Sequence, residues 1–538
     1  MIPVTNNEDA AAAKYAIERA MLGCSAWQVF AGEVSLTTIH DTNCELSVEW
    51  GKLIFAWWDD QRSQSWRVTA YEIEEAELLL QVTRGLGREM TTLTLRNEAK
   101  WREKVAFENL GLTERRRAYA QTLARLLAAR FIRLRLQTPA PGATNSELAV
   151  GTTAKRYARL RCILGGETVL AIGVSEAESQ TEIDGVIAAG LVWLANFNGQ
   201  REARPSSEQA KRLWFCLPRG YSETGMAETA MERLTLLDVS HLGARVECFE
   251  VDERREELRP VQLATQNELL NAHPRELKWP EASTASDGWR ERIVRLAPDL
   301  IEVRQIAGRE SYAINGLEFA RLNHGIETRL KFGIAGLHDE RSEIEAAGFS
   351  TLSEANFHRL ERLVQQIVTY RSAQTPDRRH PFYRLREEAW LESLLRRDIR
   401  ALDAGFDDRF VYSQIPAWRG EERSVIDLLT VNHEARLAVI EIKATEDAQL
   451  PLQGTDYWLR VEQARLRGEF AKRGLFAGIE LAGSPSLLYL VAPRLRFHRT
   501  FAIVSRCLSP QIEAYQVGLN ANWRQGARVR SIERVNQL

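Results

Sequence analysis

Two neighbouring apolar segments in the last third of the chain contain charged residues where a buried strand normally has apolar ones. The first segment, SVIDLLTV, contains Asp427, and the second, LAVIEIKA, contains Glu441 and Lys443. Short runs rich in Val, Ile and Leu predict buried strands, and the turn sequence NHEA between them predicts a hairpin. Because burying an unpaired charge is costly, these three residues need partners or a bound ion.

The spacing of the charges predicts that they meet at one place. Residues two apart in a strand lie on the same face, so Glu441 and Lys443 should lie side by side, with Ile440 and Ile442 on the opposite face. The hairpin would bring Asp427 next to Glu441. Two converging carboxylates suit a hard cation such as Mg²⁺ or Mn²⁺, and without a cation they would repel each other. The pattern therefore predicts a metal site with Asp427 and Glu441 as ligands.

The Glu-x-Lys spacing alone is a weak signal, since it also occurs at Glu98–Lys100 and Glu276–Lys278. The first of these lies in a helical, tryptophan-bearing stretch, and the second runs straight into a Trp-Pro pair, so neither lies in an apolar strand. An alternative without function remains for the third. In it, Asp427 is structural, and Glu441 and Lys443 form a surface ion pair that contributes little stability.

The elements around this hairpin follow a definite order. The helix LREEAWLESLLRRDI precedes the strands FVYSQIP, SVIDLLTV and LAVIEIKA, and the helix TDYWLRVEQARLRGEFAK and the strand SLLYLVAP follow. Over residues 380–495 this order resembles the PD-(D/E)xK, restriction-endonuclease-like nuclease superfamily. The resemblance implies a mixed sheet flanked by helices, with Asp427, Glu441 and Lys443 as catalytic residues of a metal-dependent nuclease.

In that superfamily a Glu from the first helix often completes the metal site. The apolar stripe of the corresponding helix here consists of Leu391, Leu395, Ile399 and Leu402. Glu388 falls within this stripe and Glu392 on its flank, so Glu388 is the preferred catalytic candidate and Glu392 the second. An ordinary ion pair four residues along the helix, such as Glu392 with Arg396, explains either residue equally well. Some members have a Gln in the helix after the Glu-x-Lys strand, which Gln463 would match.

The first helix and its flanks are rich in arginine. The residues predicted to bind phosphate are Arg384, Arg396, Arg397 and Arg400. A basic stretch of this kind can contact a nucleic-acid backbone, although a solvated helix face has the same composition.

The 538-residue chain exceeds what one hydrophobic core usually organises, which predicts a multidomain α/β protein. Residues 1–95 read as a small α+β domain, and residues 96–265 as an α/β domain. Residues 266–375 read as a bridging module whose fold the sequence does not indicate, and residues 376–538 as the nuclease-like domain.

The middle of the chain repeats the order of elements seen near its end. Residues 112–251 read as helix, strand, strand, helix, strand and final strand, as do residues 385–518. Setting ETVLAIGV against LAVIEIKA places Ala171 and Gly173 where Glu441 and Lys443 stand. The segment is therefore either a degenerate second nuclease-like fold without metal ligands or an unrelated α/β domain.

The composition limits the partners. Lys and Arg number 71 against 73 Asp and Glu, so contacts with nucleic acid must be local. The six cysteines form no CxxC pair, which favours buried thiols in a reducing compartment. The start MIPVTNNEDAAAAKYA lacks the pattern of a signal peptide, and the longest apolar run, 186–195, is too short to span a bilayer. We therefore expect a cytoplasmic protein without membrane contact.

The sequence thus predicts an endonuclease that uses Mg²⁺ or Mn²⁺ to hydrolyse phosphodiester bonds, with DNA favoured over RNA. A homo-oligomer is left open. Two alternatives also remain open. One is a catalytically silent nucleic-acid-binding or scaffold protein that retains the fold, and the other is a ligand-gated RNase or defence effector.

Overall fold

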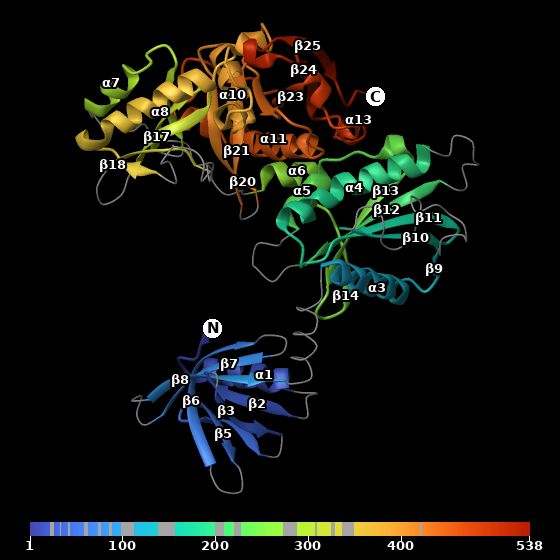
Figure 1. The fold of residues 1–538 in the computed structure, drawn as a ribbon. Coiled ribbons are helices and arrows are strands. Elements are labelled where there is room, and N and C mark those ends of the chain that lie inside the picture. The colour runs from blue at the N-terminus through green and yellow to red at the C-terminus, as the bar shows by residue number, and fades with distance from the viewer. Residues whose placement is uncertain are drawn as a thin grey trace. The chain divides into compact units, whose positions relative to one another are not determined.

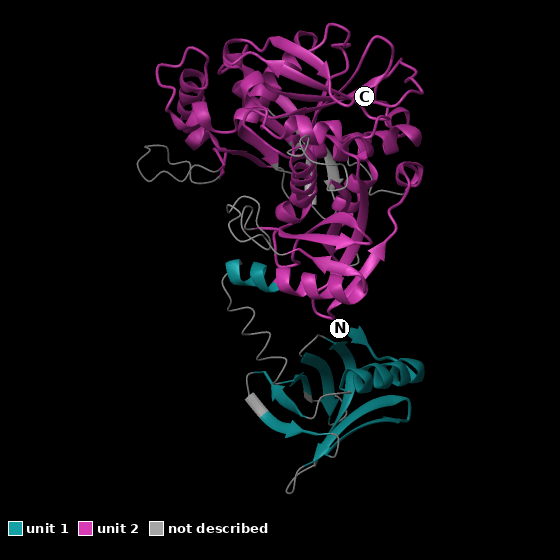
Figure 2. Ribbon diagram, turned by 90° about the vertical axis from the view of Figure 1, so that its right-hand side faces the viewer, with its two compact units in different colours: residues 1–118 teal, residues 119–538 magenta. Residues whose placement is uncertain are grey.

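The computed structural model shows a multidomain mixed α/β protein that divides into two compact units, residues 1–118 and 119–538 (Figure 2). It describes all residues except 22–25, 33, 41–42, 59–62, 74–76, 85–88, 98–111, 138–155, 200–208, 220–226, 273–287, 307–308, 324–328, 336–348, 420–421 and 538. None of the described helices combines the length and the apolar character needed to cross a membrane.

The described part of residues 1–97 forms an antiparallel sheet with helix α1 (Asn7–Met21), as the α+β prediction expects. The strands are β1 (Ile2–Pro3), β2 (Trp27–Ala31), β3 (Val34–Ile39), β4 (Cys44–Glu49), β5 (Lys52–Trp58), β6 (Ser63–Ile73), β7 (Glu77–Arg84) and β8 (Glu89–Arg96). Their order is β3-β2-β8-β7-β6-β5-β4, with β1 on β6. Helix α1 (Asn7–Met21) packs on β4, β5 and β6 through Ala10, Ala13 and Ile17, because its apolar residues recur at helical spacing.

The second unit contains three lobes, each with its own sheet (Figure 1). The middle lobe runs to residue 271 from α3 (Leu112–Arg130), the helix within which the boundary between the two units falls, and has the strand order β14-β13-β12-β11-β10-β9. Its elements are α3 (Leu112–Arg130), β9 (Leu134–Leu136), β10 (Ala158–Leu164), β11 (Glu167–Gly173), α4 (Gln180–Gly199), β12 (Ala210–Pro218), α5 (Glu228–Thr235), β13 (Arg245–Asp252), β14 (Glu257–Val261) and α6 (Gln266–Asn271).

The bridging lobe, residues 288–370, is the part whose fold the sequence did not indicate. It is an antiparallel five-stranded sheet in the order β15-β16-β17-β18-β19, with a helix on each side of it in the sequence. Its elements are α7 (Gly288–Val294), β15 (Ile301–Ile306), β16 (Arg309–Ile314), β17 (Leu317–Asn323), β18 (Arg329–Phe332), β19 (Ser350–Thr351) and α8 (Phe357–Tyr370).

The C-terminal lobe, residues 376–538, has the strand order β20-β21-β22-β23-β24-β25. Its elements are α9 (Pro381–Arg384), α10 (Glu387–Arg397), β20 (Tyr412–Arg419), β21 (Glu422–Val431), β22 (Leu437–Ile442), α11 (Leu450–Leu466), α12 (Glu469–Lys472), β23 (Leu487–Pro493), α13 (Phe501–Arg506), β24 (Glu513–Leu519) and β25 (Val529–Arg534). The predicted order of one helix, three strands, a helix and a strand is therefore present.

The middle and C-terminal sheets have the same strand order and the same strand directions. In the middle lobe β11, β12 and β13 are parallel, the flanking strands β10 and β14 are antiparallel to this trio, and β9 is antiparallel to β10. In the C-terminal lobe β22, β23 and β24 are parallel, again with antiparallel strands on both sides. The topological part of the predicted repeat is thus confirmed, including the helices between the parallel strands, α4 and α5 in one lobe and α11 and α13 in the other.

One continuous apolar core joins these two lobes. It contains Ile187 and Leu191 from α4, Leu234 from α5, Leu459 from α11 and Val504 from α13. The outer face of each sheet is covered separately, by α3 in the middle lobe and by α10 in the C-terminal lobe. Each sheet therefore lies between an outer helix of its own and the inner helices, and the inner helices of both lobes pack together in one core.

Candidate metal centre in the C-terminal lobe

The predicted hairpin forms, and its two strands separate where the charged residues lie. Strand β21 pairs with β22 only over Leu428–Val431. On its other edge it pairs with β20 over Glu422–Leu429. Asp427 is the residue at which the strands part. One of its oxygens, Oδ2, accepts a hydrogen bond of 2.8 Å from the backbone nitrogen of Ile442. The side chain of Asp427 thus replaces a strand partner at the end of β22.

Glu441 and Lys443 lie on the same face of the chain, as predicted. Lys443 Nζ donates a hydrogen bond of 3.1 Å to Glu441 Oε1 and lies 3.9 Å from Glu388 Oε2. Ile440 and Ile442 point the other way, into the core under α10. Since Leu428 is opposite Ile440 in the register, Asp427 and Glu441 are neighbours across the strands.

The two carboxyl groups are costly to ionise together. Burial, and then the neighbouring Glu441, raise the pKa of Asp427 well above its usual range. Burial also raises the pKa of Glu441 to about 7, with Glu388 adding to the rise and Lys443 and a hydrogen bond with Asp427 opposing it. Burial lowers the pKa of Lys443, but Glu441, Glu388 and Asp427 together raise it above its usual range, so the ammonium stays charged.

One carboxylate oxygen remains uncompensated. Glu441 is 2 % exposed, and its Oε2 is buried without a hydrogen-bond donor among the described residues. A buried acceptor without a donor is costly, so this oxygen favours a proton shared with Asp427 or a cation bound by both acids. The donor set, two carboxylates with hard oxygens, fits a divalent cation such as Mg²⁺.

Asp427 and Glu441 offer a cation two protein ligands at this site. Within the described part of the chain, no three His, Cys, Asp or Glu side chains converge closely enough to bind a metal. Mg²⁺ is commonly bound by one or two carboxylates, with water and substrate phosphate oxygens as its remaining ligands. Asp427 and Glu441 therefore fit the protein share of such a site, and Glu388, whose side chain is 44 % exposed, could reach it only from the solvent side.

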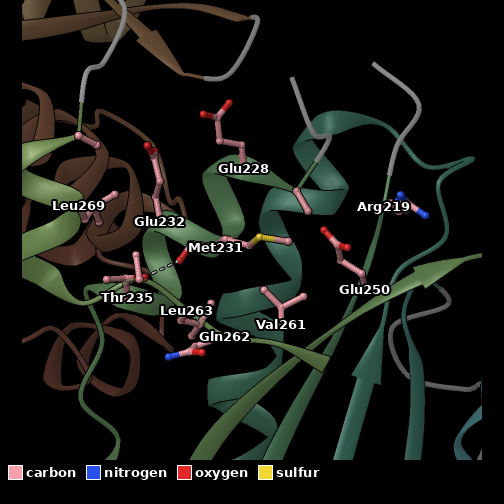
Figure 3. Close-up of a pocket in the computed structure, with 13 residues that line it drawn as sticks. Arg219, Glu228, Met231, Glu232, Thr235, Glu250, Val261, Gln262, Leu263 and Leu269 are labelled. Atoms are coloured by element: carbon pink, nitrogen blue, oxygen red, sulfur yellow. Dashed lines mark hydrogen bonds between the residues drawn. The ribbon is translucent and has the colours of Figure 1, made fainter. Parts of the chain in front are cut away.

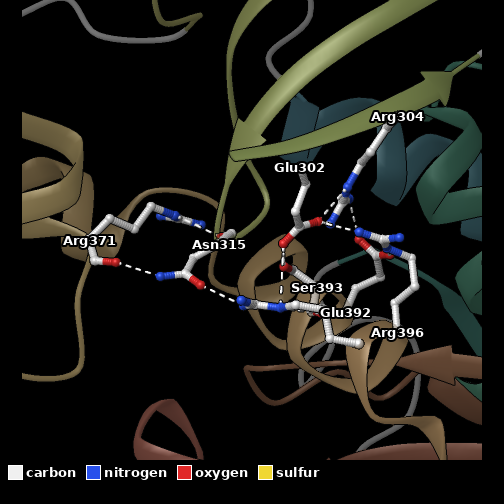
Figure 4. A network of polar contacts seen from close by, with 8 residues as sticks. Glu302, Arg304, Asn315, Arg371, Glu392, Ser393 and Arg396 are labelled. Atoms are coloured by element: carbon white, nitrogen blue, oxygen red, sulfur yellow. Dashed lines mark hydrogen bonds and ion pairs between the residues drawn. The ribbon is translucent and has the colours of Figure 1, made fainter. Parts of the chain in front are cut away.

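Glu388 is positioned by α10, and the bridging lobe braces this helix (Figure 4). Arg304 of β15 donates a hydrogen bond of 2.8 Å to Glu392 of α10, and Glu302 accepts hydrogen bonds from Ser393 and Arg396. Burial lowers the pKa of Arg304, but Glu392 and Glu302 together raise it, so the buried network is charged and paired. A charged network at this position fixes α10, the helix that carries Glu388.

The hairpin turn of the bridging lobe presses against the same helix. Asn315 and Gly316 both have positive φ, 45° and 74°, and connect β16 to β17. A Cβ on Gly316 would lie 1.9 Å from the carbonyl oxygen of Ala389, so only glycine fits there. Asn315 also accepts a hydrogen bond of 2.6 Å from Arg397.

The other predicted site residues have different surroundings. The helical-wheel argument is wrong about burial: Glu392, paired with Arg304, is the buried glutamate, whereas Glu388 is partly exposed. Gln463 is buried in α11, where its amide donates to Leu269 O and accepts from Arg460. These contacts use both ends of the amide.

The four arginines predicted to bind phosphate fall into two pairs. Arg396 and Arg397 are engaged with Glu302 of the bridging lobe. Arg384 and Arg400 are exposed on the surface around α10. Phosphate binding by these residues remains a prediction, and the exposed pair is better placed for it.

The prediction that Ala171 and Gly173 stand where Glu441 and Lys443 do is wrong by one residue. Ala171 pairs with Leu160 and faces α3, as Ile440 pairs with Leu428 and faces α10.

The equivalents of the three charged residues are Arg159, Ile172 and Val174. Ile172 occupies the position of Glu441, with Arg159 opposite it in the place of Asp427. Val174 occupies the position of Lys443, since its nitrogen donates to Cys216 O as the nitrogen of Lys443 donates to Val491 O. The middle lobe therefore has neither carboxylate nor lysine at these three positions.

A cavity of about 440 Å³ lies elsewhere in the middle lobe (Figure 3). Glu228, Glu232 and Glu250 line it together with Arg219 and apolar residues such as Leu269. Glu232 is already paired with Arg460, at 2.7 Å. None of the predicted site residues lines this cavity.

Two features of the site were not foreseen from the sequence. The bracing of α10 depends on Glu302 and Arg304, which precede it by about ninety residues and carry no local signal. The second feature is the turn at Asn315 and Gly316, which does have a local sequence signal. Asn-Gly between alternating apolar residues predicts a tight hairpin, and this signal was overlooked.

Comparison with models of known protein families and with curated proteins finds no match for this chain. The function is therefore argued from the chemistry of the site.

Proposed function

We propose that the C-terminal lobe is a nuclease domain of the PD-(D/E)xK class that uses Mg²⁺ or Mn²⁺ to hydrolyse phosphodiester bonds in DNA. The observation that carries the proposal is the convergence of Asp427, Glu441 and Lys443 where β21 and β22 separate, with a buried Glu441 oxygen that has no donor. An arrangement that disfavours its own charged state without a cation is expected at a functional site.

Each residue has a use in phosphodiester hydrolysis. Asp427 and Glu441 would hold the cation, which supplies Lewis-acid polarisation of the phosphate and lowers the pKa of a bound water. Lys443 would neutralise the negative charge that develops on the phosphate or orient the attacking water. Glu388, 3.9 Å from Lys443 Nζ, would hold this ammonium between two carboxylates. The exposed arginines Arg384 and Arg400 would contact phosphates along the strand.

One observation favours a second candidate, a catalytically silent nucleic-acid-binding or scaffold protein. Lys443 already compensates one oxygen of Glu441, and a proton shared between Asp427 and Glu441 would satisfy the rest of the site without a metal. The two candidates predict opposite results in a cleavage assay.

The test measures cleavage of plasmid, single-stranded DNA and RNA with Mg²⁺ or Mn²⁺. Lys443→Ala should lower the rate by at least about 10²–10³-fold and leave the fold intact, because Lys443 acts on charge that develops during the reaction. Asp427→Ala should abolish cleavage and the rise in Tm that the cation produces in the wild type. Lys472→Ala, an exposed lysine in the same lobe, is the matched control and should retain full activity.

Wild-type protein that cleaves none of these substrates and shows no metal-dependent rise in Tm would replace the nuclease proposal with the silent scaffold. Cleavage of RNA alone would keep the chemistry and change the substrate.

A further inference from the structure

The middle and C-terminal lobes pack on each other in a reciprocal way. Helices α4 and α11 are equivalent, since each follows the first strand of a parallel trio, and α5 and α13 are equivalent, since each follows the second. In the structure α4 packs on α13, and α11 packs on α5. Each lobe therefore uses its two equivalent helices to contact the other lobe.

The segments that follow α5 and α13 show the same reciprocity in their backbones. Leu237 and Leu508 form an isolated antiparallel bridge. The nitrogen of Asp238 donates to Cys507 O, and the nitrogen of Ser509 donates to Leu236 O, both at 2.8 Å. This exchange of two equal hydrogen bonds is the pattern of an isologous interface, in which the same patch is used on both sides.

A buried ion pair links the lobes beside this bridge. Arg233 of α5 donates two hydrogen bonds, 3.0 and 2.7 Å, to the carboxylate of Asp456 in α11, and a third of 2.9 Å to the carbonyl of Asp184 in α4. Arg233 and Asp456 are 1 % and 5 % exposed. Such a pair holds the two lobes in one arrangement, since breaking it leaves a buried charge.

The chain thus has the organisation of a two-fold dimer contained in one polypeptide, with chemistry in one lobe only. The two strands of a DNA duplex are themselves related by a local two-fold axis, and symmetric DNA-binding dimers match that symmetry. If both lobes were active, each would cleave one strand of the duplex. Here the second lobe has Arg159, Ile172 and Val174 at the equivalent positions, so it lacks both carboxylates and the lysine.

We propose that each chain cuts only one strand of a duplex, with the middle lobe serving as the non-catalytic half of an internal dimer. This inference rests on the proposed nuclease function and specifies its substrate and product. In the reaction the oxygen of a water molecule bonds to phosphorus and the bond from phosphorus to one sugar oxygen breaks. The leaving oxygen takes up a proton, so one nick with a phosphate and a hydroxyl end is formed.

The first experiment follows supercoiled plasmid with the full-length chain and Mg²⁺ or Mn²⁺ over time. We expect nicked circles to accumulate first, with linear DNA arising only later from independent nicks. Linear product that forms without a nicked intermediate, at any protein concentration, overturns the inference and leaves the proposed function standing. Cleavage confined to single-stranded substrates has the same meaning. No cleavage of any nucleic acid overturns both.

The second experiment uses a linear duplex with a different label on each strand. Lys443→Ala should lose cleavage of both labelled strands, because the chain has one active centre. If the middle lobe had its own active centre, Lys443→Ala would still cut one strand, and this result would overturn the inference. Lys472→Ala should cut like the wild type and controls for the substitution itself.

Discussion

The middle and C-terminal lobes have the same strand order and strand directions, but different residues at the end of one equivalent strand. In the C-terminal lobe β22 ends with Glu441 and Lys443 beside Asp427, and the hairpin is open at that point. In the middle lobe the equivalent residues at the end of β11 are Ile172 and Val174, and β11 remains paired with β10 along its length. The scaffold is thus maintained without the charged residues.

The fold of these lobes therefore forms both with and without the three charged residues. The middle lobe has the buried apolar residues Ile172 and Val174 where the C-terminal lobe has Glu441 and Lys443, which with Asp427 form three ionisable groups with shifted pKa values. A lobe that serves only stability would be expected to look like the middle one, because apolar burial stabilises and unpaired buried charge does not. The C-terminal lobe therefore bears a cost that a function would explain.

The largest effect we predict tests whether the two lobes form one unit. Arg233→Ala should lower the free energy of unfolding of residues 119–538 by about 3–5 kcal/mol, because Asp456 loses its guanidinium and remains buried. Urea denaturation followed by tryptophan fluorescence measures this loss.

Two controls sharpen the Arg233 result. Arg125→Ala removes the exposed pair with Glu256 and should change stability little. The double substitution Arg233→Met with Asp456→Leu should cost less than Arg233→Ala alone, since it removes both buried charges. An unchanged free energy in Arg233→Ala would show that the lobes do not depend on this contact.

A medium effect tests how closely α3 packs on β11, since Gly173 occupies the position that Ile442 has under α10. Gly173→Ala should destabilise by about 1–3 kcal/mol, because the new Cβ would lie 2.6 Å from Tyr119 Oη and Leu123 Cδ2. Gly199→Ala is the control, since nothing lies within 4 Å of a Cβ there, and its effect should be small. If Gly173→Ala were neutral in thermal melts, α3 would not pack closely on the end of β11, and this difference from Ile442 under α10 would not hold.

Much of the fold was predictable because regular apolar patterns are local. The segments SVIDLLTV and LAVIEIKA form β21 and β22 as predicted, and the helix expected at the start of residues 112–251 forms α3 (Leu112–Arg130). Helix α4 begins at Gln180, before the apolar run 186–195. Its first turns contain polar residues such as Gln180 and Asp184, which hydrogen-bond to each other and so lack an apolar signal.

The site was predictable in part for a similar reason. The alternation of a strand places Glu441 beside Lys443, and a short turn returns Asp427 to them, so local rules suffice. The burial of Glu392 could not be predicted from its helix, because Arg304, 88 residues away, provides the partner that makes burial tolerable. The reciprocal contact at Leu237 and Leu508 is likewise formed by residues far apart in the sequence.

The smallest effect we predict compares a buried glutamate in each lobe. Burial raises the pKa of Glu253, next to β13, from its ordinary 4.5 to about 7, with Glu176 and Glu178 adding to the rise and hydrogen bonds from Glu176 N and Ser175 Oγ opposing it. Between pH 4.5 and about 7 the folded protein therefore keeps a proton on Glu253 that the unfolded chain has released. This contribution to stability is complete below pH 4.5 and is lost as the pH rises through about 7.

Glu253→Gln should remove this part of the pH dependence, a difference on the order of 1 kcal/mol between pH 4.5 and 8, because one pKa unit corresponds to about 1.4 kcal/mol and water screens part of it. Thermal melts over that pH range measure it. Glu441 also has a raised pKa, but at pH 8 Mg²⁺ should stabilise the wild type and Glu253→Gln equally and leave Asp427→Ala unchanged. If Glu253→Gln removed the response to Mg²⁺, the cation would be acting in the middle lobe, and the assignment of chemistry to the C-terminal lobe would have to be reversed.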